Sequence, residues 1–389
     1  MTKDNVSLGT SGWSYKEWEG PFYEKGEDKK LRAYSRVFST AEIDSTFYRY
    51  PSKGMVMGWL RYSPSEFLFT AKVPKLITHN KKLGLKGNIK SDLEAFFEVM
   101  RPLQLGGKLA CFLIQLPPGY AFNLENLESF FGMLDPMFKY AVEFRNFSWM
   151  REETWDLLRK YNVAYVNVDE PLLPPEVHLT AKFSYFRWHG RGTRPWFDYE
   201  YTQEQLKEWV PRVENAAAKV EKTYGFFNNH YRGNAVKNCL QLLEMLGKLT
   251  PEQAEVKAKV DEHFKKAMLQ PELGAFEEPP ESSFEGLLRG FIDVSRLEKA
   301  KAIDDNELMI NLDSPERVEA EVREYHIIID FTTKTILHDC ADWNKGLPAK
   351  RFCKHIGKLF LSLKRQKATA LLENIKDQKE SWQFRPYAQ

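Results

Sequence analysis

Eight short apolar runs recur along the first 247 residues, and most of them are followed by a segment with helical spacing. The runs are Val6–Trp13, Thr40–Tyr48, Phe67–Pro74, Leu109–Leu116, Tyr140–Arg145, Ala164–Asp169, Phe183–His189 and Thr223–Asn229. The helical segments include Leu31–Phe38, Leu93–Leu103, Leu124–Met133, Glu153–Tyr161, Glu204–Val220 and Gly233–Leu246, with apolar residues three or four positions apart. Alternating strands and helices are typical of a parallel sheet, and eight such units match a closed barrel better than an open sheet. The sequence therefore predicts an α/β fold, with a (β/α)8 TIM barrel over residues 1–247.

A second, smaller domain is expected after the barrel, because 389 residues are too many for one ordinary core. Residues 248–283 read as a helix that starts at Thr250, followed by a linker rich in Pro, Glu and Ser. Beyond this linker the sequence predicts short strands at Leu308–Leu312, Glu319–Phe331 and Thr335–Leu337, and a final helix from Cys353 to Gln378. Residues 284–389 are thus predicted to form a small α+β domain.

Two of the four cysteines and two of the eight histidines lie within eighteen residues of this second domain. They form the pattern His-x-Cys, twelve residues, Cys-x-His, with His338, Cys340, Cys353 and His355 as the four side chains. Thiolate and imidazole are the ligands that Zn²⁺ prefers, and a closed shell of four such ligands is usually structural. We therefore predict a structural zinc site and a small α+β zinc-binding domain. The alternative is that both cysteines are buried as small hydrophobic residues.

Charge, cysteine content and hydropathy indicate the compartment and the kinds of partner to expect. The formal charge of +2 provides no overall steering of a charged partner. Four cysteines in so long a chain do not make a disulfide framework, which favours a reducing cytoplasm. The N-terminus lacks a signal-peptide pattern, and no run of about eighteen apolar residues occurs. We expect a cytoplasmic protein with no membrane partner.

Polar residues end most of the predicted strands, where TIM barrels place their active sites. The acid–base candidates are Glu42, Asp44, Glu143, Asp169 and His189. The ligand-binding candidates are Trp13, Lys72, Arg145, Arg187 and Asn228. The functional interpretation is a pocket for a phosphate- or sugar-containing molecule. The alternative is a structural ion-pair network, for which Glu143 with Arg145 or Arg187 would suffice.

Seven motifs identify the barrel as similar to the YecE-like family of unknown function. They are GTSGWSYKEWEGPFY at 9–23, EIDSTFYR at 42–49, FTAKVPKLITH at 69–79, QLPP at 115–118, VEFRNFSW at 142–149, FRWHGR at 186–191 and FFNNHYRGNAVKN at 226–238. The C-terminal segment resembles the SWIM zinc finger, although His338 stands where that pattern usually has a first cysteine. By analogy with similar barrels, the resemblance implies phosphodiesterase-type hydrolysis or sugar isomerisation. A Mg²⁺ or Mn²⁺ ion on the barrel carboxylates is an associated expectation.

A run of eight basic residues without an acidic one extends from Lys345 to Lys367. Seven of them are predicted to contact nucleic acid: Lys350, Arg351, Lys354, Lys358, Lys364, Arg365 and Lys367. Because the whole chain carries +2, the residues outside this run sum to −6. Two hypotheses follow. The first is a protein whose zinc module binds DNA or RNA while the barrel acts on a phosphate-containing ligand. The second is a metabolic enzyme for a small molecule, with the zinc module making protein contacts.

Overall fold

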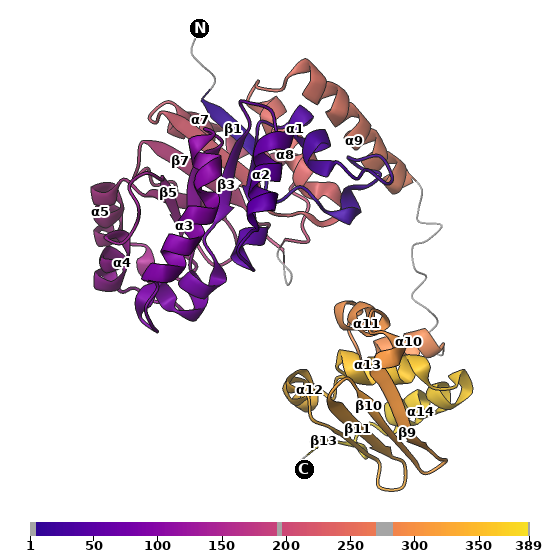
Figure 1. Cartoon of the computed structure of the whole chain (residues 1–389). Coiled ribbons are helices and arrows are strands. Elements are labelled where there is room, and N and C mark those ends of the chain that lie inside the picture. The colour runs from indigo at the N-terminus through magenta and orange to yellow at the C-terminus, as the bar shows by residue number, and fades with distance from the viewer. Residues whose placement is uncertain (1–4, 193–196, 270–282, 388–389) are drawn as a thin grey trace. The chain divides into compact units, whose positions relative to one another are not determined.

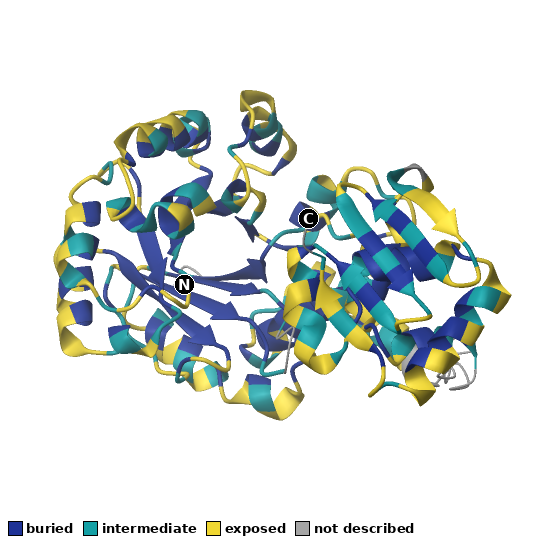
Figure 2. Ribbon diagram, turned by 90° about the horizontal axis from the view of Figure 1, so that it is seen from below, coloured by how far each residue is buried: buried dark blue, intermediate teal, exposed yellow. Residues whose placement is uncertain are grey.

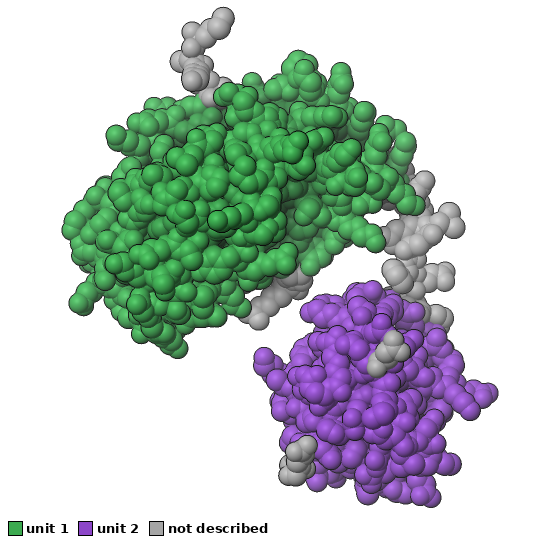
Figure 3. Space-filling model, in the orientation of Figure 1, with its two compact units in different colours: residues 1–269 green, residues 270–389 purple. Residues whose placement is uncertain are grey.

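The computed structural model describes residues 5–192, 197–269 and 283–387. The chain divides into two compact units, residues 1–269 and residues 270–389 (Figure 3). No helix in the described ranges is long and apolar enough to cross a membrane.

The first unit is built on eight parallel strands, as the sequence predicts (Figure 1). They are β1 (Val6–Thr10), β2 (Thr40–Ile43), β3 (Leu68–Lys72), β4 (Leu109–Gln115), β5 (Tyr140–Glu143), β6 (Ala164–Asp169), β7 (Phe183–Trp188) and β8 (Lys222–Phe227). From β2 to β8 each strand pairs with the next one along the chain, and β8 pairs with β1. Between β1 and β2 the connection is narrow, consisting of a bridge from Ser11 to Glu42 and a hydrogen bond from Gly12 N to the Glu42 carbonyl of 2.8 Å. The strands therefore form a nearly closed barrel.

Helices surround this barrel. They are α1 (Lys30–Val37), α2 (Lys53–Tyr62), α3 (Lys90–Leu105), α4 (Leu124–Phe131), α5 (Glu152–Tyr161), α6 (Gln203–Lys207), α7 (Val210–Ala217) and α8 (Asn234–Met245). Local sequence sets their ends: Thr202 and Gln205 form a capping box at α6, and Asn162 ends α5 in the left-handed region at φ 52°. Figure 2 shows the buried strands inside and the exposed helix faces outside. This two-layer arrangement brings the carboxyl ends of all eight strands to one end of the barrel.

A ninth helix, α9 (Pro251–Leu269), belongs to the barrel unit. Gln253 Nε2 donates to the carbonyl of Val37 at 2.7 Å, and Val260 is buried in the barrel core. The division between the units therefore falls after residue 269, later than the residue 247 expected from the sequence. The segment 270–282, which was predicted to be linker, lies outside the described residues.

The second unit is a five-stranded sheet covered by helices on one face. The strands are β9 (Leu308–Asp313), β10 (Arg317–Val322), β11 (Tyr325–Asp330), β12 (Thr335–His338) and β13 (Gln383–Pro386), in the order β13-β12-β11-β10-β9. The helices are α10 (Phe284–Arg289), α11 (Val294–Lys301), α12 (Ala341–Gly346), α13 (Lys354–Ser362) and α14 (Arg365–Asp377). Two predictions need correction. Residues 319–331 are not one strand, because a hairpin with Arg323 at φ 58° separates β10 from β11. The final helix is broken at Leu363, which is extended.

Candidate ligand site and metal centre

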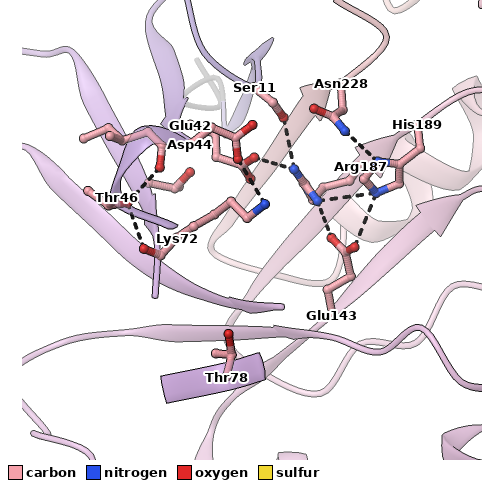
Figure 4. A network of polar contacts seen from close by, with 12 residues as sticks. Ser11, Glu42, Asp44, Thr46, Lys72, Thr78, Glu143, Arg187, His189 and Asn228 are labelled. Carbon is pink, nitrogen blue, oxygen red and sulfur yellow. Dashed lines mark hydrogen bonds and ion pairs between the residues drawn. The ribbon is translucent and has the colours of Figure 1, made fainter. Parts of the chain in front are cut away.

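A chain of buried ion pairs joins three strands at the carboxyl end of the barrel (Figure 4). Arg187, at the end of β7, donates to Glu42 on β2 and to Glu143 on β5, each at 2.6 Å. The Tyr185 hydroxyl also donates to Glu42 at 2.6 Å. The side chains of Glu42 and Glu143 are 0% exposed and that of Arg187 is 1% exposed. Charges buried this deeply persist only when paired, and here each one is.

Arg145 extends this chain toward solvent. Its Nε lies 2.5 Å from Glu143, and its Nη1 donates to Glu170, the residue that follows β6. Its Nη2 lies 2.9 Å from His189 Nε2. The second oxygen of Glu170, Oε1, is buried and has no hydrogen-bond partner among the described residues. We call the group Glu42, Arg187, Glu143, Arg145, Glu170 and His189 the mouth network.

His189 is a neutral member of this network. Burial lowers the pKa of His189 to about 3, and the neighbouring Arg145 lowers it further than Glu143 raises it. Arg145 can only donate, so Nε2 of His189 must be the accepting nitrogen. Its Nδ1 then carries the proton and faces the amide of Asn228 at 3.0 Å, which accepts when its oxygen occupies that position. His189 therefore lies between a cation and an amide.

The carboxyl groups of the network have pKa values shifted in opposite directions. Burial alone would raise the pKa of Glu143, but Arg145 and Arg187 outweigh it and hold the pKa well below its ordinary value. Burial raises the pKa of Glu170 to about 7, and Arg145 and Arg187 only partly oppose the shift. Burial also raises the pKa of Glu42. Carboxyls of one site with pKa values on opposite sides of the usual range can take the roles of proton donor and anion.

The rim above the network is polar and aromatic. Asp44 pairs with Lys72 at 3.2 Å, and the Lys72 ammonium lies 4.4 Å from the ring centre of Phe47. Tyr48 follows Phe47 and is 79% exposed. Burial first, and then the Asp44 carboxylate, raise the pKa of Tyr48, which places the two residues within electrostatic reach. The rim thus offers a half-buried carboxylate, a cation and an exposed ring.

Two histidines from the following loops also reach the rim. His79 packs edge-on against Phe47, with ring centres 4.9 Å apart, and burial followed by Lys72 lowers the pKa of His79 to about 4. His230 stacks on Tyr15 at 4.4 Å, and burial lowers the pKa of His230 although Asp44 opposes the shift. Both imidazoles are therefore neutral at neutral pH.

The structure brings together eight of the ten barrel residues predicted from the sequence: Glu42, Asp44, Lys72, Glu143, Arg145, Arg187, His189 and Asn228. Asp169 does not join them, because it accepts hydrogen bonds from Arg191 Nε at 2.9 Å and from Trp209 Nε1 at 2.7 Å. Trp13 also lies elsewhere. It packs edge-on against Trp59 and lines a groove of about 710 Å³ between α1 and α2.

Glu170 is the network member that sequence reasoning missed. Successive residues of a strand point to opposite faces, so Asp169 and Glu170 cannot both face the mouth. The signal was present as two consecutive acidic residues at the end of β6, and the choice between them depended on the register of the strand.

The expected Mg²⁺ or Mn²⁺ site in the barrel does not form among the described residues. Glu42, Glu143 and Glu170 each bind a guanidinium, and no group of three His, Cys, Asp or Glu side chains converges there on a common point. The carboxylates serve the arginines instead of a metal.

The second unit contains a group suited to a metal. His338, Cys340, Cys353 and His355 are buried, and one ligand atom from each lies within 4.8 Å of the others. His338 ends β12, Cys340 caps the N-terminus of α12, Cys353 caps that of α13, and His355 follows in its first turn. The loop between the two doublets folds back as predicted, because α12 and a short turn occupy it. Two thiols and two imidazoles in a closed shell are the donor set that fits Zn²⁺.

Surrounding contacts prepare these ligands for a metal. His338 Nδ1 donates to the carbonyl of His326 at 2.6 Å, which leaves Nε2 deprotonated and aimed inward. The Nε2 atoms of His338 and His355 are both buried without a hydrogen-bond partner among the described residues. Buried imidazole nitrogens are rarely left unpaired, and a bound cation would satisfy both. A hydrogen bond from Cys353 lowers the pKa of Cys340, which favours thiolate there, whereas burial raises the pKa of Cys353.

The basic run does not form one continuous cationic face. Lys358 pairs with Asp305 at 2.5 Å, Lys367 pairs with Asp313, and Lys350 donates to the carbonyl of Lys379 at 2.6 Å. Arg351, Lys364 and Arg365 are exposed, and Lys354 is half-buried. Lys364 and Lys367 also line a groove of about 530 Å³ beside α14.

Comparison with known proteins places the barrel in a family. Residues 7–261 match the family described as "Protein of unknown function DUF72". The chain belongs to this family. UPF0759 protein YunF of Bacillus subtilis (strain 168) is 26% identical over 267 residues, covering 62% of this chain and 94% of that protein. UPF0759 protein YecE of Escherichia coli (strain K12) is 26% identical over 144 residues, covering 36% of this chain and 48% of that protein.

Solved structures agree with this assignment. A DUF72 family protein of Thermotoga maritima MSB8 is 36% identical, with a TM-score of 0.58, and the match covers 62% of this chain and 99% of that one. A DUF72 family protein of Enterococcus faecalis V583 is 23% identical, with a TM-score of 0.53, over 62% of this chain and 97% of that one, and shows the same fold. The mouth network lies within the DUF72 part of the chain, whereas the His and Cys ligands lie beyond it. The predicted YecE-like barrel is therefore confirmed.

Proposed function

We propose that the barrel mouth binds a small sugar- or phosphate-containing molecule and transfers a proton to or from it. The observation that carries the proposal is the mouth network itself, in which five charged side chains and a neutral imidazole converge at the strand ends. A purely structural network would gain little, because a buried ion pair is often no more stabilising than apolar packing. Charges concentrated at the carboxyl ends of barrel strands are instead typical of a ligand site.

Accessibility separates the ligand-contacting residues from those that support them. The side chains of Asp44, Lys72 and Arg145 are 26%, 10% and 9% exposed. Asn228 is also partly exposed, whereas Glu42, Glu143 and His189 lie beneath. In this proposal the first group touches the ligand, and the buried group fixes its position and charge. Metal-dependent phosphodiesterase chemistry gains no support, since the carboxylates of the described residues serve guanidinium groups.

Asp44→Asn tests this proposal while leaving the buried network in place. Ligand-observed NMR on a mixture of monosaccharides, polyols and their phosphate esters should show saturation transfer to at least one compound with the native protein. A charge-assisted hydrogen bond contributes about 1.5–3 kcal/mol, so the variant should bind about 10- to 100-fold more weakly.

Glu66→Gln is the matched control, because Glu66 is exposed and lines a groove at the opposite end of the barrel. It should bind like the native protein. Transfer to no compound, or equal transfer in native protein and Asp44→Asn, would refute the proposal.

For the second unit we propose a structural zinc ion held by His338, Cys340, Cys353 and His355 in a SWIM-like module. The unpaired inward nitrogens of the two histidines support it. As its partner we propose nucleic acid, supported by the exposed Arg351, Lys364 and Arg365. These three residues define a smaller contact than the seven-residue run expected from the sequence.

A further inference from the structure

We infer that the ligand of the barrel mouth is an uncharged polyhydroxyl compound, a sugar or polyol, and not a phosphate ester. The inference rests on the proposed function and narrows its ligand class. Four observations about the same site support the inference. Its cations are paired with carboxylates, its imidazoles are neutral, its side chains offer both hydrogen-bond donors and acceptors, and aromatic rings lie at its rim.

Three cations of the site, among the residues that the structure describes, are already bonded to carboxylates. Arg187 lies between Glu42 and Glu143, Arg145 lies between Glu143 and Glu170, and Lys72 pairs with Asp44. A phosphate group could take the donors that Arg187 and Arg145 already give to Glu42, Glu143 and Glu170 only by displacing a carboxylate. The displaced carboxylate would remain buried without a partner, which typically costs about 3–5 kcal/mol.

The imidazoles of the site do not help to bind an anion. Four carboxyl groups, Glu42, Asp44, Glu143 and Glu170, face three cations, Lys72, Arg145 and Arg187, and Lys75 lies nearby on the exposed surface. The three imidazoles add no positive charge at neutral pH, because burial holds the pKa of His189, His79 and His230 below its ordinary value. The three imidazoles therefore offer a phosphate dianion no charge-assisted contact.

Hydroxyl groups fit the same side chains without disturbing them. Asp44 offers an acceptor, Lys72 and Arg145 offer donors, and the Asn228 amide offers both. A hydroxyl donates and accepts at once, so it can lie between Asp44 and Lys72 and bond both without changing the charge of either. The vicinal hydroxyls of a sugar repeat this pattern along the ligand.

Aromatic rings complete the match. Tyr48 is 79% exposed beside Asp44, and Phe47 carries Lys72 over its face. The stacked pair of Tyr15 and His230 also lies within electrostatic reach of Asp44. An exposed ring next to a carboxylate offers an apolar surface for the C–H face of a sugar while its hydroxyls bond the polar groups.

Paired probes test this inference on the full chain: D-glucose, D-fructose, D-xylose and xylitol, together with glucose 6-phosphate, fructose 6-phosphate and xylulose 5-phosphate. Ligand-observed NMR titrations at low and at physiological salt would give each affinity. We expect at least one neutral probe to bind at least tenfold more tightly than every phosphate ester, with an affinity that salt does not change. Tyr48→Ala should weaken that probe at least fivefold, whereas Tyr62→Ala, at another exposed tyrosine on α2, should not.

Each other result has a definite meaning. A phosphate ester that binds more tightly, with an affinity that falls as salt rises and is lost in Asp44→Asn, would overturn this inference and leave the proposed function standing. Binding of neither class, or binding that Asp44→Asn does not change, would overturn both. Neutral binding that Tyr48→Ala leaves unchanged would overturn the aromatic contact and with it the inference. Circular dichroism on each variant confirms that the barrel is folded.

Discussion

Glu170 is the residue whose protonation the structure perturbs toward neutral pH. Its folded pKa of about 7 lies above the ordinary carboxyl value of 4.5, so between these pH values the folded state binds more protons than the unfolded state. Stability therefore falls as pH rises from about 4.5 to 7, by up to about 3 kcal/mol from this group. Glu170→Gln cannot ionise at this position, so its stability should not fall in this way. As pH rises from about 4.5 to 7, the unfolding free energy of the variant should therefore increase relative to that of the native protein. Urea unfolding at several pH values measures it.

Glu128→Gln is the comparison variant, since Glu128 is a partly exposed carboxylate paired with Lys160 on the outside of the barrel. It should show no such pH dependence. A difference in unfolding free energy between Glu170→Gln and native protein that stays constant from pH 4.5 to 7 would contradict the raised pKa.

Glu170 also shows why the site could not be predicted fully from the sequence. Strand ends can be located from the apolar pattern, but whether Asp169 or Glu170 faces inward depends on register, which neighbouring strands decide.

Among the secondary-structure elements, α12 and α13 would depend most on the proposed zinc ion. Each begins at a cysteine ligand, so the ion would tie both helix starts to the end of β12. Cys340→Ser should reduce bound zinc from about one ion per chain to nearly none, and the amides of α12 and α13 should lose protection from hydrogen exchange. Metal analysis and exchange mass spectrometry check both results.

Cys239→Ala provides the control, because Cys239 is buried in α8 of the barrel. It should keep its zinc, and in both variants the barrel amides should stay protected. A metal-free second unit with α12 and α13 still protected would contradict a structural ion.

The elements themselves were largely predictable. Strands β1 to β8 follow from buried apolar runs, because interior strands of a barrel are apolar on both faces. The turn at Arg323 was missed because Glu319–Phe331 reads as one uninterrupted strand pattern, without the Asn or Gly that favours positive φ. The break at Leu363 has no Pro or Gly beside it, and only the packing of α14 reveals it. Sequence patterns give element type well and interruptions poorly.

At the scale of the whole molecule, each unit has its own core, and the two proposed activities are assigned to different units. The full chain should be retained on immobilised DNA or RNA at low salt, and replacing Arg351, Lys364 and Arg365 by Ala should lower the elution salt concentration clearly. Each lost phosphate contact should reduce the steepness of the salt dependence by roughly one unit.

A triple variant at exposed barrel lysines, Lys25, Lys86 and Lys160, removes the same charge from the other unit. Retention that falls equally in both triple variants would show a general charge effect and contradict a contact on the second unit. Retention that neither variant changes would contradict nucleic-acid binding through these residues.

The narrow connection between β1 and β2 limits which residues could replace Glu42. Glu42 makes this connection with its backbone, through Ser11 and Gly12, while its carboxylate binds Arg187 in the mouth network. The same residue therefore joins β1 to β2 through its backbone and holds Arg187 through its side chain. Backbone closure of the barrel and the base of its proposed ligand site thus share one residue, so a substitution at Glu42 would have to satisfy both.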